Sequence, residues 1–407
     1  MLDVLIVGGG ASGLAISSML KKHNKSLKIT VAEKMDRVGK KLAITGNGRC
    51  NITNLSQNIS NYHSNSLSQA LEILDNFSLD ETEKFFSSLG LSFTAENTKI
   101  YPLSFQAASV VDILRFSAAK FGVNILTDTK ICSLKKENDY FLATTNHNNT
   151  ITSKCVVVAT GGLAGGSRLG SDGDGYNLLK SFGHCILPQS PVIVQVKTDN
   201  TYTRQLKGIK VTAGVNVNKN GKIYADFGEV LFSDYGLSGP PILQLSRHCS
   251  KGSKICLDLL PDYSEKDITE TLIKRKEILS HIPLSDFFAG LINKKLGLTL
   301  LKVCNINQNR FTETLTNSEI SSLSKCIKEF KFEVFGNTGF ANAQATSGGA
   351  DLNDFDNTLM SKKCSGLFAS GEVLDLDGDC GGYNLQWAWS SAAAVTNGIL
   401  KLMGEEK

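Results

Sequence analysis

The feature that most constrains the fold is a glycine-rich turn between a short apolar run and a stretch of helical spacing near the N-terminus. Residues 2–7 form the apolar run, and the turn carries Gly8, Gly10 and Gly13. Glu33 follows about 20 residues later, at the end of the next predicted strand. Glycines let the backbone approach a pyrophosphate, the helix N-terminus offers free N–H groups to it, and the acid accepts hydrogen bonds from a ribose. This arrangement predicts a dinucleotide-binding βαβ unit.

The rest of the chain alternates between β and helical patterns. Residues 64–121 have mostly helical spacing, and residues 123–159 form short β runs that end in a strand typical of one covered on both faces. Beyond Pro188 apolar residues alternate, with Asn220-Gly221 as a hairpin turn, and residues 264–331 return to helical spacing. We therefore predict a discontinuous α/β domain with an inserted antiparallel β domain and a small helical domain. The predicted bounds are 1–187 and 335–407 for the α/β domain, 188–262 for the β insertion and 263–334 for the helical insertion.

Composition excludes several classes of protein. With 37 glycines but only 7 prolines in 407 residues, the chain is neither collagen-like nor a Pro-rich disordered segment. Hydrophobic residues at 41% and charged residues at 20% are typical of a globular protein. The net charge is +4 without a block of like charges, which neither indicates a nucleic-acid surface nor excludes a local basic patch. We expect a small-molecule substrate and no nucleic-acid partner. No apolar run is long enough to span a membrane, and Asp3 argues against a secretion signal.

Cysteine and histidine positions argue against a metal centre. The ten cysteines include no CxxC pair, which favours reduced thiols in a cytoplasmic protein over a disulfide framework. The six histidines are scattered, and none lies in a glycine-rich motif. Cys50 and Cys380 each lie inside such a motif, but buried, inert thiols are the favoured interpretation.

The residues after Glu33 distinguish between the possible dinucleotides. An NAD domain continues with regular βα alternation, whereas this chain continues with a basic, glycine-bearing extension. Together with motifs in the middle and at the C-terminus, this extension closely resembles the BaiN/RdsA (YhiN-like) family of NAD(P)/FAD-dependent oxidoreductases. The motifs that carry the resemblance are GGGASG at 8–13, GKKLAITGNGRCNITN at 39–54, ATGG at 159–162, TSGGA at 346–350, GEVLD at 371–375 and CGGYNLQ at 380–386.

The resemblance covers essentially the whole chain and implies a two-domain flavoprotein type of fold. FAD would be held non-covalently by the discontinuous Rossmann-like domain, with the pyrophosphate on the glycine turn and the ribose on the acid after the second strand. The residues that we expect to bind the cofactor are Gly8, Gly10, Ala11, Ser12, Gly13, Glu33, Lys34, Lys41, Gly46, Asn47, Gly48, Arg49, Cys50, Asn51, Ile131, Thr160, Gly161, Gly371, Glu372, Asp375, Gly382, Tyr383, Asn384 and Gln386.

Near the isoalloxazine the residue types suggest specific roles. The glycines around Asn47 allow backbone N–H groups to turn toward a planar ring. Arg49 either stabilises negative charge at the N1–C2=O edge of the reduced flavin or forms a structural salt bridge. The last predicted helix would direct its N-terminus at the same edge, with Asn384 and Gln386 as hydrogen-bonding groups. Tyr101 and Tyr235 are either proton donors or structural side chains, and no residue is assigned to catalysis.

The expected activity is hydride transfer through flavin N5 to or from a small organic substrate held between the FAD domain and the insertions. The resemblance implies reduction of activated C=C bonds, as in 3-oxo-steroid or bile-acid dienones, for some members. For others it implies oxidation of an aminoketone with release of peroxide. Since no second strand-associated GxGxxG occurs, NAD(P)H would bind only transiently as reductant.

A flavoprotein that acts on tRNA is the alternative from another class. It would need a basic stripe, and the helical insertion offers only the short clusters 274–276 and 294–295. We interpret these as solvated helix faces.

Overall fold

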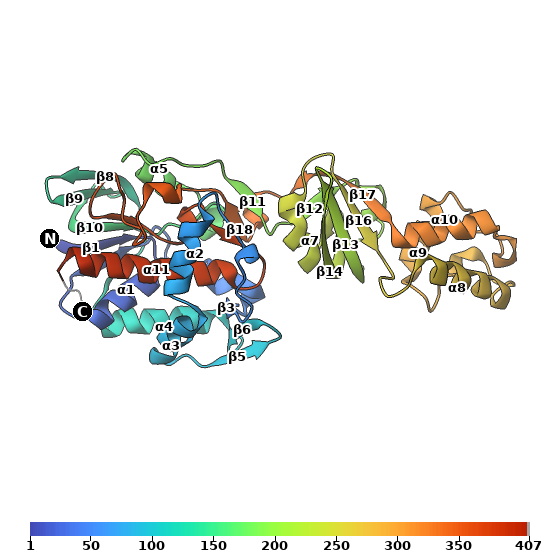
Figure 1. The fold of residues 1–407 in the computed structure, drawn as a ribbon, viewed down its shortest axis with the longest axis horizontal. Helices are drawn as coiled ribbons and strands as arrows, with labels where there is room; N and C mark the ends of the chain where they lie inside the picture. Colours follow the sequence, from blue (N-terminus) through green and yellow to red (C-terminus); the bar gives the residue numbers. More distant parts are fainter. Residues whose placement is uncertain (405–407) are drawn as a thin grey trace. The chain divides into compact units, whose positions relative to one another are not determined.

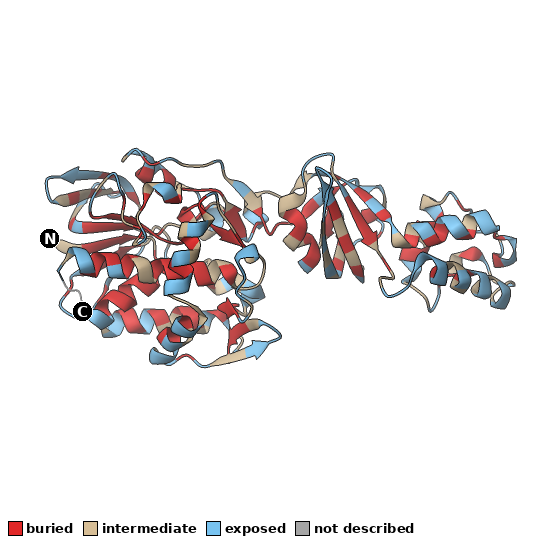
Figure 2. Ribbon diagram, viewed as in Figure 1, coloured by how far each residue is buried: buried red, intermediate tan, exposed pale blue. Residues whose placement is uncertain are grey.

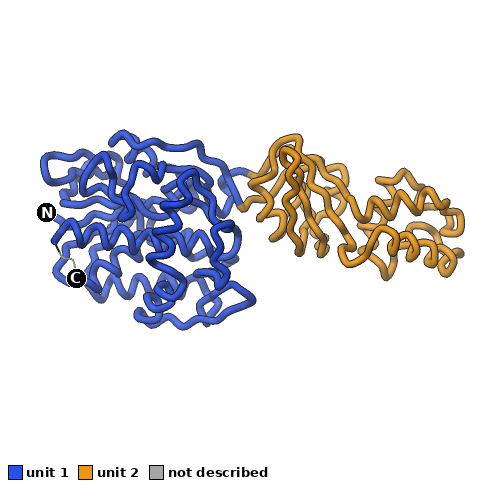
Figure 3. The backbone as a smooth tube through the Cα atoms, viewed as in Figure 1, with its two compact units in different colours: residues 1–192, 339–407 blue, residues 193–338 orange. Residues whose placement is uncertain are grey.

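The computed structural model describes residues 1–404 and divides the chain into two compact units (Figure 3). Unit 1 combines Met1–Val192 with Gly339–Lys407, and unit 2 is Ile193–Thr338. Each unit has its own core of buried apolar side chains. The two ends of the sequence therefore share one core, which confirms the predicted discontinuous α/β domain with an insertion.

A seven-stranded sheet forms the centre of unit 1, with the order β7-β2-β1-β10-β9-β8 and with β19 beside β10 (Figure 1). The pairs β1–β2, β1–β10, β2–β7 and β10–β19 are parallel, whereas β8–β9 and β9–β10 are antiparallel. The strands are β1 (Leu2–Val7), β2 (Ile29–Ala32), β7 (Asn124–Leu126), β8 (Ile131–Glu137), β9 (Tyr140–Thr145), β10 (Thr150–Val158) and β19 (Leu367–Ala369).

The parallel strands place their carboxyl ends at one edge of the sheet. Val7 pairs with both Ala32 of β2 and Val158 of β10, so the chain leaves three strands at the same level. Their apolar runs are buried on both faces, which Figure 2 shows as continuous red strands. In open α/β sheets, ligands bind outside such carboxyl ends. This edge is therefore where the glycine turn and Glu33 have to meet.

Helices of unit 1 cover this sheet, and α1 packs beside the long C-terminal helix α11 (Figure 1). The helix α11 buries Trp387 and Trp389 completely, and its Gly398 lies so close to Thr358 that a Cβ would come within 2.7 Å of that side chain. The helices are α1 (Ala11–His23), α2 (Leu67–Asn76), α3 (Leu79–Ser88), α4 (Ala107–Lys120), α5 (Asp174–Lys180) and α11 (Tyr383–Leu402).

Three small sheets connect the cofactor motifs to the rest of unit 1. The orders are β3-β6-β5, β4-β20 and β11-β18. Two of them join a segment before residue 200 to one beyond residue 340, so they tie the two halves of the discontinuous domain together. The strands are β3 (Thr53–Asn54), β4 (Tyr62–His63), β5 (Phe93–Glu96), β6 (Lys99–Pro102), β11 (Ser190–Val192), β18 (Ala345–Ser347) and β20 (Asp377–Gly378).

Unit 2 contains a closed barrel with the order β12-β15-β14-β13-β16-β17. The predicted hairpin at Asn220-Gly221 is confirmed, since Lys219 pairs with Lys222 across the turn. Apolar residues alternate into the barrel core along β13, at 213, 215 and 217. The elements are β12 (Val196–Thr198), α6 (Asn200–Thr203), β13 (Lys210–Lys219), β14 (Lys222–Ser233), β15 (Gly236–Ser238), α7 (Pro240–Leu245), β16 (Lys254–Asp258), α8 (Glu265–Ile278), α9 (Lys294–Val303), α10 (Asn317–Lys328) and β17 (Phe330–Asn337).

The strand β17 belongs to the barrel, although it follows the helices α8, α9 and α10 in the sequence. Its Phe330, Phe332 and Val334 are buried in the same core as the inward side chains of the helices. The β-rich and helical segments, which the sequence pattern separates at residue 262, are thus one unit in the structure. Within residues 1–404 no helix combines the length and apolar character that crossing a bilayer requires.

Candidate functional site

The glycine turn after β1 brings three backbone segments into close approach. Gly8 has φ +109°, and a Cβ there would lie 2.4 Å from the carbonyl oxygen of Ala159, which follows β10. A Cβ on Gly13 would lie 2.0 Å from the carbonyl oxygen of Gly8. Real Cβ atoms do not approach so closely, so both positions require glycine. These two residues let the N-terminal end of α1 pack directly against the strand ends.

Gly10 has a different role in the same turn. It is the N-cap of α1, its φ is −83°, and a Cβ there would meet no atom within 4 Å. No side chain caps the helix, and no acidic residue lies in its first turn. The first turn of α1 therefore lacks a capping side chain, and the space beside Gly10 is open, an arrangement that suits a phosphate anion.

Glu33 is fixed at the end of β2 by the main chain. Its two carboxylate oxygens accept hydrogen bonds from the amides of Gly9 at 2.8 Å and Met35 at 2.9 Å. Each oxygen has a further lone pair for a ribose hydroxyl. The structure thus holds the predicted acid beside the turn, as a dinucleotide site requires.

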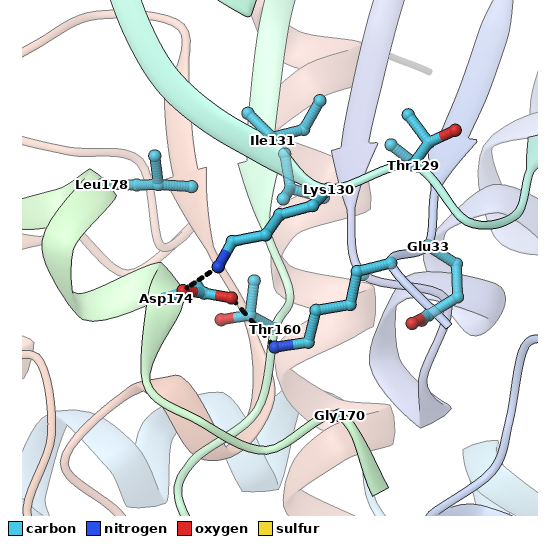
Figure 4. Close-up of a pocket in the computed structure, with 12 residues that line it drawn as sticks. Glu33, Thr129, Lys130, Ile131, Thr160, Gly170, Asp174 and Leu178 are labelled. Atoms are coloured by element: carbon cyan, nitrogen blue, oxygen red, sulfur yellow. Dashed lines mark hydrogen bonds and ion pairs between the residues drawn. The ribbon is translucent and has the colours of Figure 1, made fainter. Parts of the chain in front are cut away.

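A cavity lies at the carboxyl ends of β1 and β2 (Figure 4). It brings together five of the residues predicted from the sequence. These are Gly8, Glu33, Lys34, Ile131 and Thr160. The hydroxyl of Thr160 is buried and makes no hydrogen bond to any described residue, so the cavity wall carries a free polar group. We call this space the adenosine cavity, because it adjoins the acid and the glycine turn.

Two lysines and an aspartate cross the adenosine cavity. Lys34 Nζ lies 2.9 Å and Lys130 Nζ 2.7 Å from the carboxylate of Asp174, and Figure 4 shows Lys130 pointing toward Asp174. Burial raises the pKa of Asp174, but hydrogen bonds from both lysines outweigh it and bring the pKa to about 2. Lys130 and Asp174 were not predicted from the sequence, because only the assembled sheet brings the starts of β8 and α5 to this edge.

The loop between β2 and β3 is anchored to the distant C-terminal motifs. Lys41 forms an ion pair with Glu372, and the other oxygen of Glu372 accepts a hydrogen bond from the amide of Thr346 at 2.8 Å. Three predicted cofactor motifs therefore meet at one carboxylate. Further along the loop, Gly46 and Asn47 have φ of +57° and +56°, values that non-glycine residues adopt rarely.

Arg49 forms a salt bridge, as one of its two predicted interpretations requires, and its role toward a flavin stays a prediction. Its guanidinium lies 2.5 Å from Glu96 and stacks over the rings of Tyr101 at 4.5 Å and Phe105 at 4.6 Å. These contacts hold the loop between β2 and β3 against the β3-β6-β5 sheet. Arginine suits this place because a planar guanidinium stacks on an aromatic ring while it binds a carboxylate.

Cys50 is fully buried next to this arginine. Burial raises the pKa of its thiol to about 12, and a hydrogen bond with Thr45 offsets only part of that effect. A thiol that does not ionise near neutral pH is a poor nucleophile. This agrees with the interpretation of Cys50 as inert, and no disulfide occurs among the described residues, which include all ten cysteines.

We expect iodoacetamide at pH 8 to leave Cys50 unmodified in the folded protein and to alkylate the exposed Cys132 and Cys185. The measurement is peptide mass spectrometry after a short exposure, with urea-unfolded protein as the control in which all three thiols react. Alkylation of Cys50 at the rate of Cys132 would contradict the burial of this thiol.

The motif after β19 links the two helices that flank the sheet. The Gly371 amide donates to Ser391 Oγ at 3.0 Å, and its carbonyl accepts from the indole N–H of Trp387 at 3.1 Å. A Cβ on Gly371 would lie 2.8 Å from Ser12 Oγ on α1. This glycine therefore fixes the distance between α1 and α11.

Side chains at the start of α11 are used within the protein. The side-chain oxygen of Asn384 accepts a hydrogen bond from the Gly378 amide at 2.9 Å, and its Nδ2 donates one to the Gly378 carbonyl at 2.8 Å. The Tyr383 hydroxyl donates a hydrogen bond to the Ser56 carbonyl. The side-chain amide of Gln386 donates hydrogen bonds within a buried network. The structure thus gives Asn384 and Gln386 structural partners rather than free groups for a flavin edge. The role of the main-chain N–H groups of the first turn stays a prediction. The side chain of Asn51 lies beside Gly382, with its oxygen buried and without a partner among the described residues.

A second cavity, of about 400 Å³, lies among the middle and C-terminal motifs of unit 1. Of its lining, only Asp375 was predicted as a site residue. The lining residues are Tyr62, His63, Ser64, Asn65, Leu67, Leu187, Pro188, Ser347, Gly348 and Asp375. The segment 62–67 has no glycine signature, so the sequence pattern offered no signal for it. We call this space the motif cavity.

Asp375 is a buried carboxyl at the wall of the motif cavity. Only 5% of the residue is exposed, and the Asn65 amide donates to its carboxylate at 3.0 Å. Burial raises the pKa of Asp375, and the negative charges of Asp377 and Asp351 add to this effect, while hydrogen bonds from Asn65 and Ser64 oppose it. A carboxyl with a raised pKa in a cavity is typical of a functional site.

The chain is similar to known proteins over nearly its whole length. The family model described as the HI0933-like protein Rossmann domain matches residues 2–398. The 3-dehydro-bile acid delta(4,6)-reductase of Clostridium scindens is 34% identical over 95% of this chain and 96% of its own length. The ribosomal RNA dihydrouridine synthase of Haemophilus influenzae is 28% identical over 97% of this chain and 98% of its own.

Solved structures resemble the fold. The open conformation of a flavocytochrome c3 fumarate reductase gives a TM-score of 0.53 at 15% identity, over 98% of this chain and 78% of that one. The 3-ketosteroid delta1-dehydrogenase of Sterolibacterium denitrificans gives 0.50 at 13% identity, over 98% of this chain and 99% of that one. At such low identity these comparisons establish a shared two-domain flavoprotein architecture.

Proposed function

The chain belongs to the HI0933-like Rossmann family, a family of flavoprotein oxidoreductases, and from this premise we propose that it reduces an activated C=C bond in a small organic substrate. The observation that carries the proposal is the 34% identity to the bile-acid reductase across 95% of this chain and 96% of the relative. Both the cofactor motifs and the insertion are therefore included in the similarity.

The reactions that the names of these two relatives describe share one chemistry. A 3-oxo steroid with double bonds at positions 4 and 6 and the uracil ring that becomes dihydrouracil each contain a C=C bond conjugated to a carbonyl. Such a bond accepts a hydride at its electron-poor carbon, and the adjacent carbon then takes a proton. We propose that the substrate of this chain has the same conjugated carbonyl. The greater identity to the steroid reductase favours a small molecule over RNA as that substrate.

The residues at the sheet edge fit FAD. Gly10 leaves open space at the uncapped start of α1, where a pyrophosphate would bind, and Glu33 is oriented to accept ribose hydroxyls. Thr160 adds an unpartnered hydroxyl in the adenosine cavity. When bound, reduced FAD supplies a hydride, whereas this chain positions the reactants and handles the proton.

We infer that the motif cavity receives the conjugated part of the substrate. Its volume of about 400 Å³ lies within the range of about 300–1,000 Å³ typical of small-molecule sites. Ser347, Gly348 and Asp375 in its wall belong to motifs that the family resemblance puts around the cofactor.

We further propose NAD(P)H as a transient reductant, a role that needs no second dinucleotide fold. We propose the cytoplasm as the location of the protein.

Anaerobic stopped-flow absorbance tests the proposal on the flavin-loaded protein. We expect NADH or NADPH to bleach the oxidised flavin, and a 3-oxo-4,6-dienone steroid to restore it while the dienone absorbance falls. Bleaching by an aminoketone with release of peroxide would instead establish an oxidase. Reoxidation by a uridine-containing ribosomal RNA transcript, but not by the dienone, would transfer the proposal to RNA. A protein that none of these reagents oxidises or reduces would refute it.

A further inference from the structure

His63 is a titratable side chain in the wall of the motif cavity that no sequence motif identified. It lies on β4, which pairs antiparallel with β20 so that His63 is opposite Asp377 and Tyr62 is opposite Gly378. The strand β20 begins at Asp377, two residues after Asp375. Backbone pairing therefore places the imidazole at the same wall as the buried carboxyl of Asp375.

The imidazole of His63 is oriented by a carboxylate that is itself held. Its Nε2 lies 2.9 Å from Asp379 Oδ1, and Asp379 Oδ2 accepts a hydrogen bond from Asn61 Nδ2 at 3.1 Å. The amide of Asp379 also donates to the Asn61 carbonyl at 2.8 Å. Asn61, Asp379 and His63 thus form a chain in which each group fixes the next. A histidine oriented by a carboxylate is the usual form of a general acid or base in enzymes.

The environment of His63 is polar, acidic and open to a ligand. About 32% of its side chain is exposed, whereas only 14% of Asp379 is. The charged groups that face it are Asp379, its strand partner Asp377, and Asp375 across the cavity wall. No lysine or arginine belongs to the described lining of this cavity. A substrate in the cavity would therefore meet one group able to carry a positive charge.

The buried tyrosines of unit 1 are less suited to proton transfer in this cavity. The Tyr62 hydroxyl donates to Gln57 Oε1 at 2.6 Å, and the Tyr383 hydroxyl donates to the Ser56 carbonyl at 2.8 Å. The hydroxyl of Tyr176 is sealed from solvent. Tyr101 remains, but its ring packs against Arg49 beside Gly46 and does not line the cavity. Tyr101 is therefore the alternative proton donor that the test has to include.

We propose that His63, paired with Asp379, protonates the substrate in concert with hydride transfer, an inference that rests on the proposed function. As the hydride brings an electron pair to the electron-poor carbon, the C=C electrons move to the adjacent carbon, and the imidazolium N–H bond breaks as a C–H bond forms there. The conjugated carbonyl is retained in the product. Asp379 stabilises the imidazolium, and water returns the lost proton to the ring, so the net addition is one hydride and one proton.

The first experiment compares His63→Gln with His147→Gln in the flavin-loaded protein. His147 is a matched control, because it is also in unit 1 and its ring Nε2 donates one hydrogen bond, to the carbonyl of Asp128 at 2.9 Å. We expect His63→Gln to slow dienone-dependent flavin reoxidation by about 100-fold or more and to leave flavin reduction by NAD(P)H within about twofold. His147→Gln should change neither rate.

A second readout does not depend on turnover. Diethyl pyrocarbonate modifies exposed imidazoles, and we expect saturating dienone to protect His63 but not His147 in a peptide mass spectrum of the wild-type protein. Turnover with normal rates in His63→Gln and without protection of His63 would overturn this inference alone. A selective loss of rate in Tyr101→Phe, with His63→Gln normal, would assign the proton to Tyr101 and also overturn it. A wild-type protein that neither turns over the dienone nor shows protection would refute the proposed function as well.

Discussion

Replacing Gly10 by alanine is expected to leave unit 1 folded and to weaken FAD binding by about tenfold or more, which corresponds to about 1.4 kcal/mol. The backbone at Gly10 has φ −83°, which alanine adopts without strain, and the new methyl group would meet no protein atom within 4 Å. That open space is where the pyrophosphate has to approach the N-terminus of α1. The methyl group therefore obstructs the cofactor and not the fold.

The matched variant Gly13→Ala separates the two effects, since it lies only three positions further on. Its Cβ would come within 2.0 Å of the Gly8 carbonyl oxygen, so the turn has to shift away from β1. We expect a loss of about 3 kcal/mol or more in the free energy of unfolding of unit 1, because overpacking against backbone has no flexible side chain to yield.

Flavin absorbance after gel filtration gives the occupancy of both variants, and tryptophan fluorescence gives the stability of unit 1. The chain has only two tryptophans, Trp387 and Trp389, and both are buried in α11, so the signal reports on unit 1 alone. Wild-type FAD affinity in Gly10→Ala would show that the pyrophosphate does not use this turn. Wild-type stability in Gly13→Ala would contradict the close approach of α1 and β1.

The second large effect is expected at Gln386, which is 1% exposed in the first turns of α11. Its amide nitrogen donates to the Phe77 carbonyl and the hydroxyls of Thr82 and Ser390, each at 3.0 Å, and its oxygen accepts from Thr53 at 2.6 Å. Gln386→Leu has similar volume but leaves buried polar groups without partners. We expect it to lower the free energy of unfolding of unit 1 by about 2–4 kcal/mol.

Urea unfolding of the apo protein, followed by tryptophan fluorescence, measures this loss. Gln106→Leu is the control, since Gln106 is an exposed glutamine of unit 1 whose substitution should stay within about 0.5 kcal/mol of wild type. If Gln386→Leu were as stable as the control, the buried network would not support α11. A loss of flavin affinity with unchanged stability would point to a direct contact of Gln386 with the cofactor instead.

Local patterns were sufficient to predict the adenosine end of the site. Gly8, Gly10, Gly13 and Glu33 lie within one βαβ unit, and their roles depend on short-range geometry that residue type dictates. The hairpin at Asn220-Gly221 was predictable for the same reason, because a two-residue turn needs backbone angles that these residues favour.

Other parts of the site depended on contacts that no local pattern records. Lys41 and Glu372 are separated by most of the chain and meet because β19 returns beside β10. The contacts of Arg49 with the aromatic rings of Tyr101 and Phe105 likewise depend on how β6 and the turn after it approach the loop. His63 and Asp379 meet only through the pairing of β4 with β20.

By itself, the sequence determined that the chain carries a dinucleotide-binding turn, a discontinuous α/β domain and a β insertion, since glycine spacing and apolar periodicity act over a few residues. Only the tertiary structure decided which polar side chains line a cavity, as His63 does, and which form hydrogen bonds with buried neighbours, as Gln386 does. The physical reason is that hydrogen-bond partners and burial are set by segments hundreds of residues apart, whose approach depends on the packing of the whole sheet and its helices.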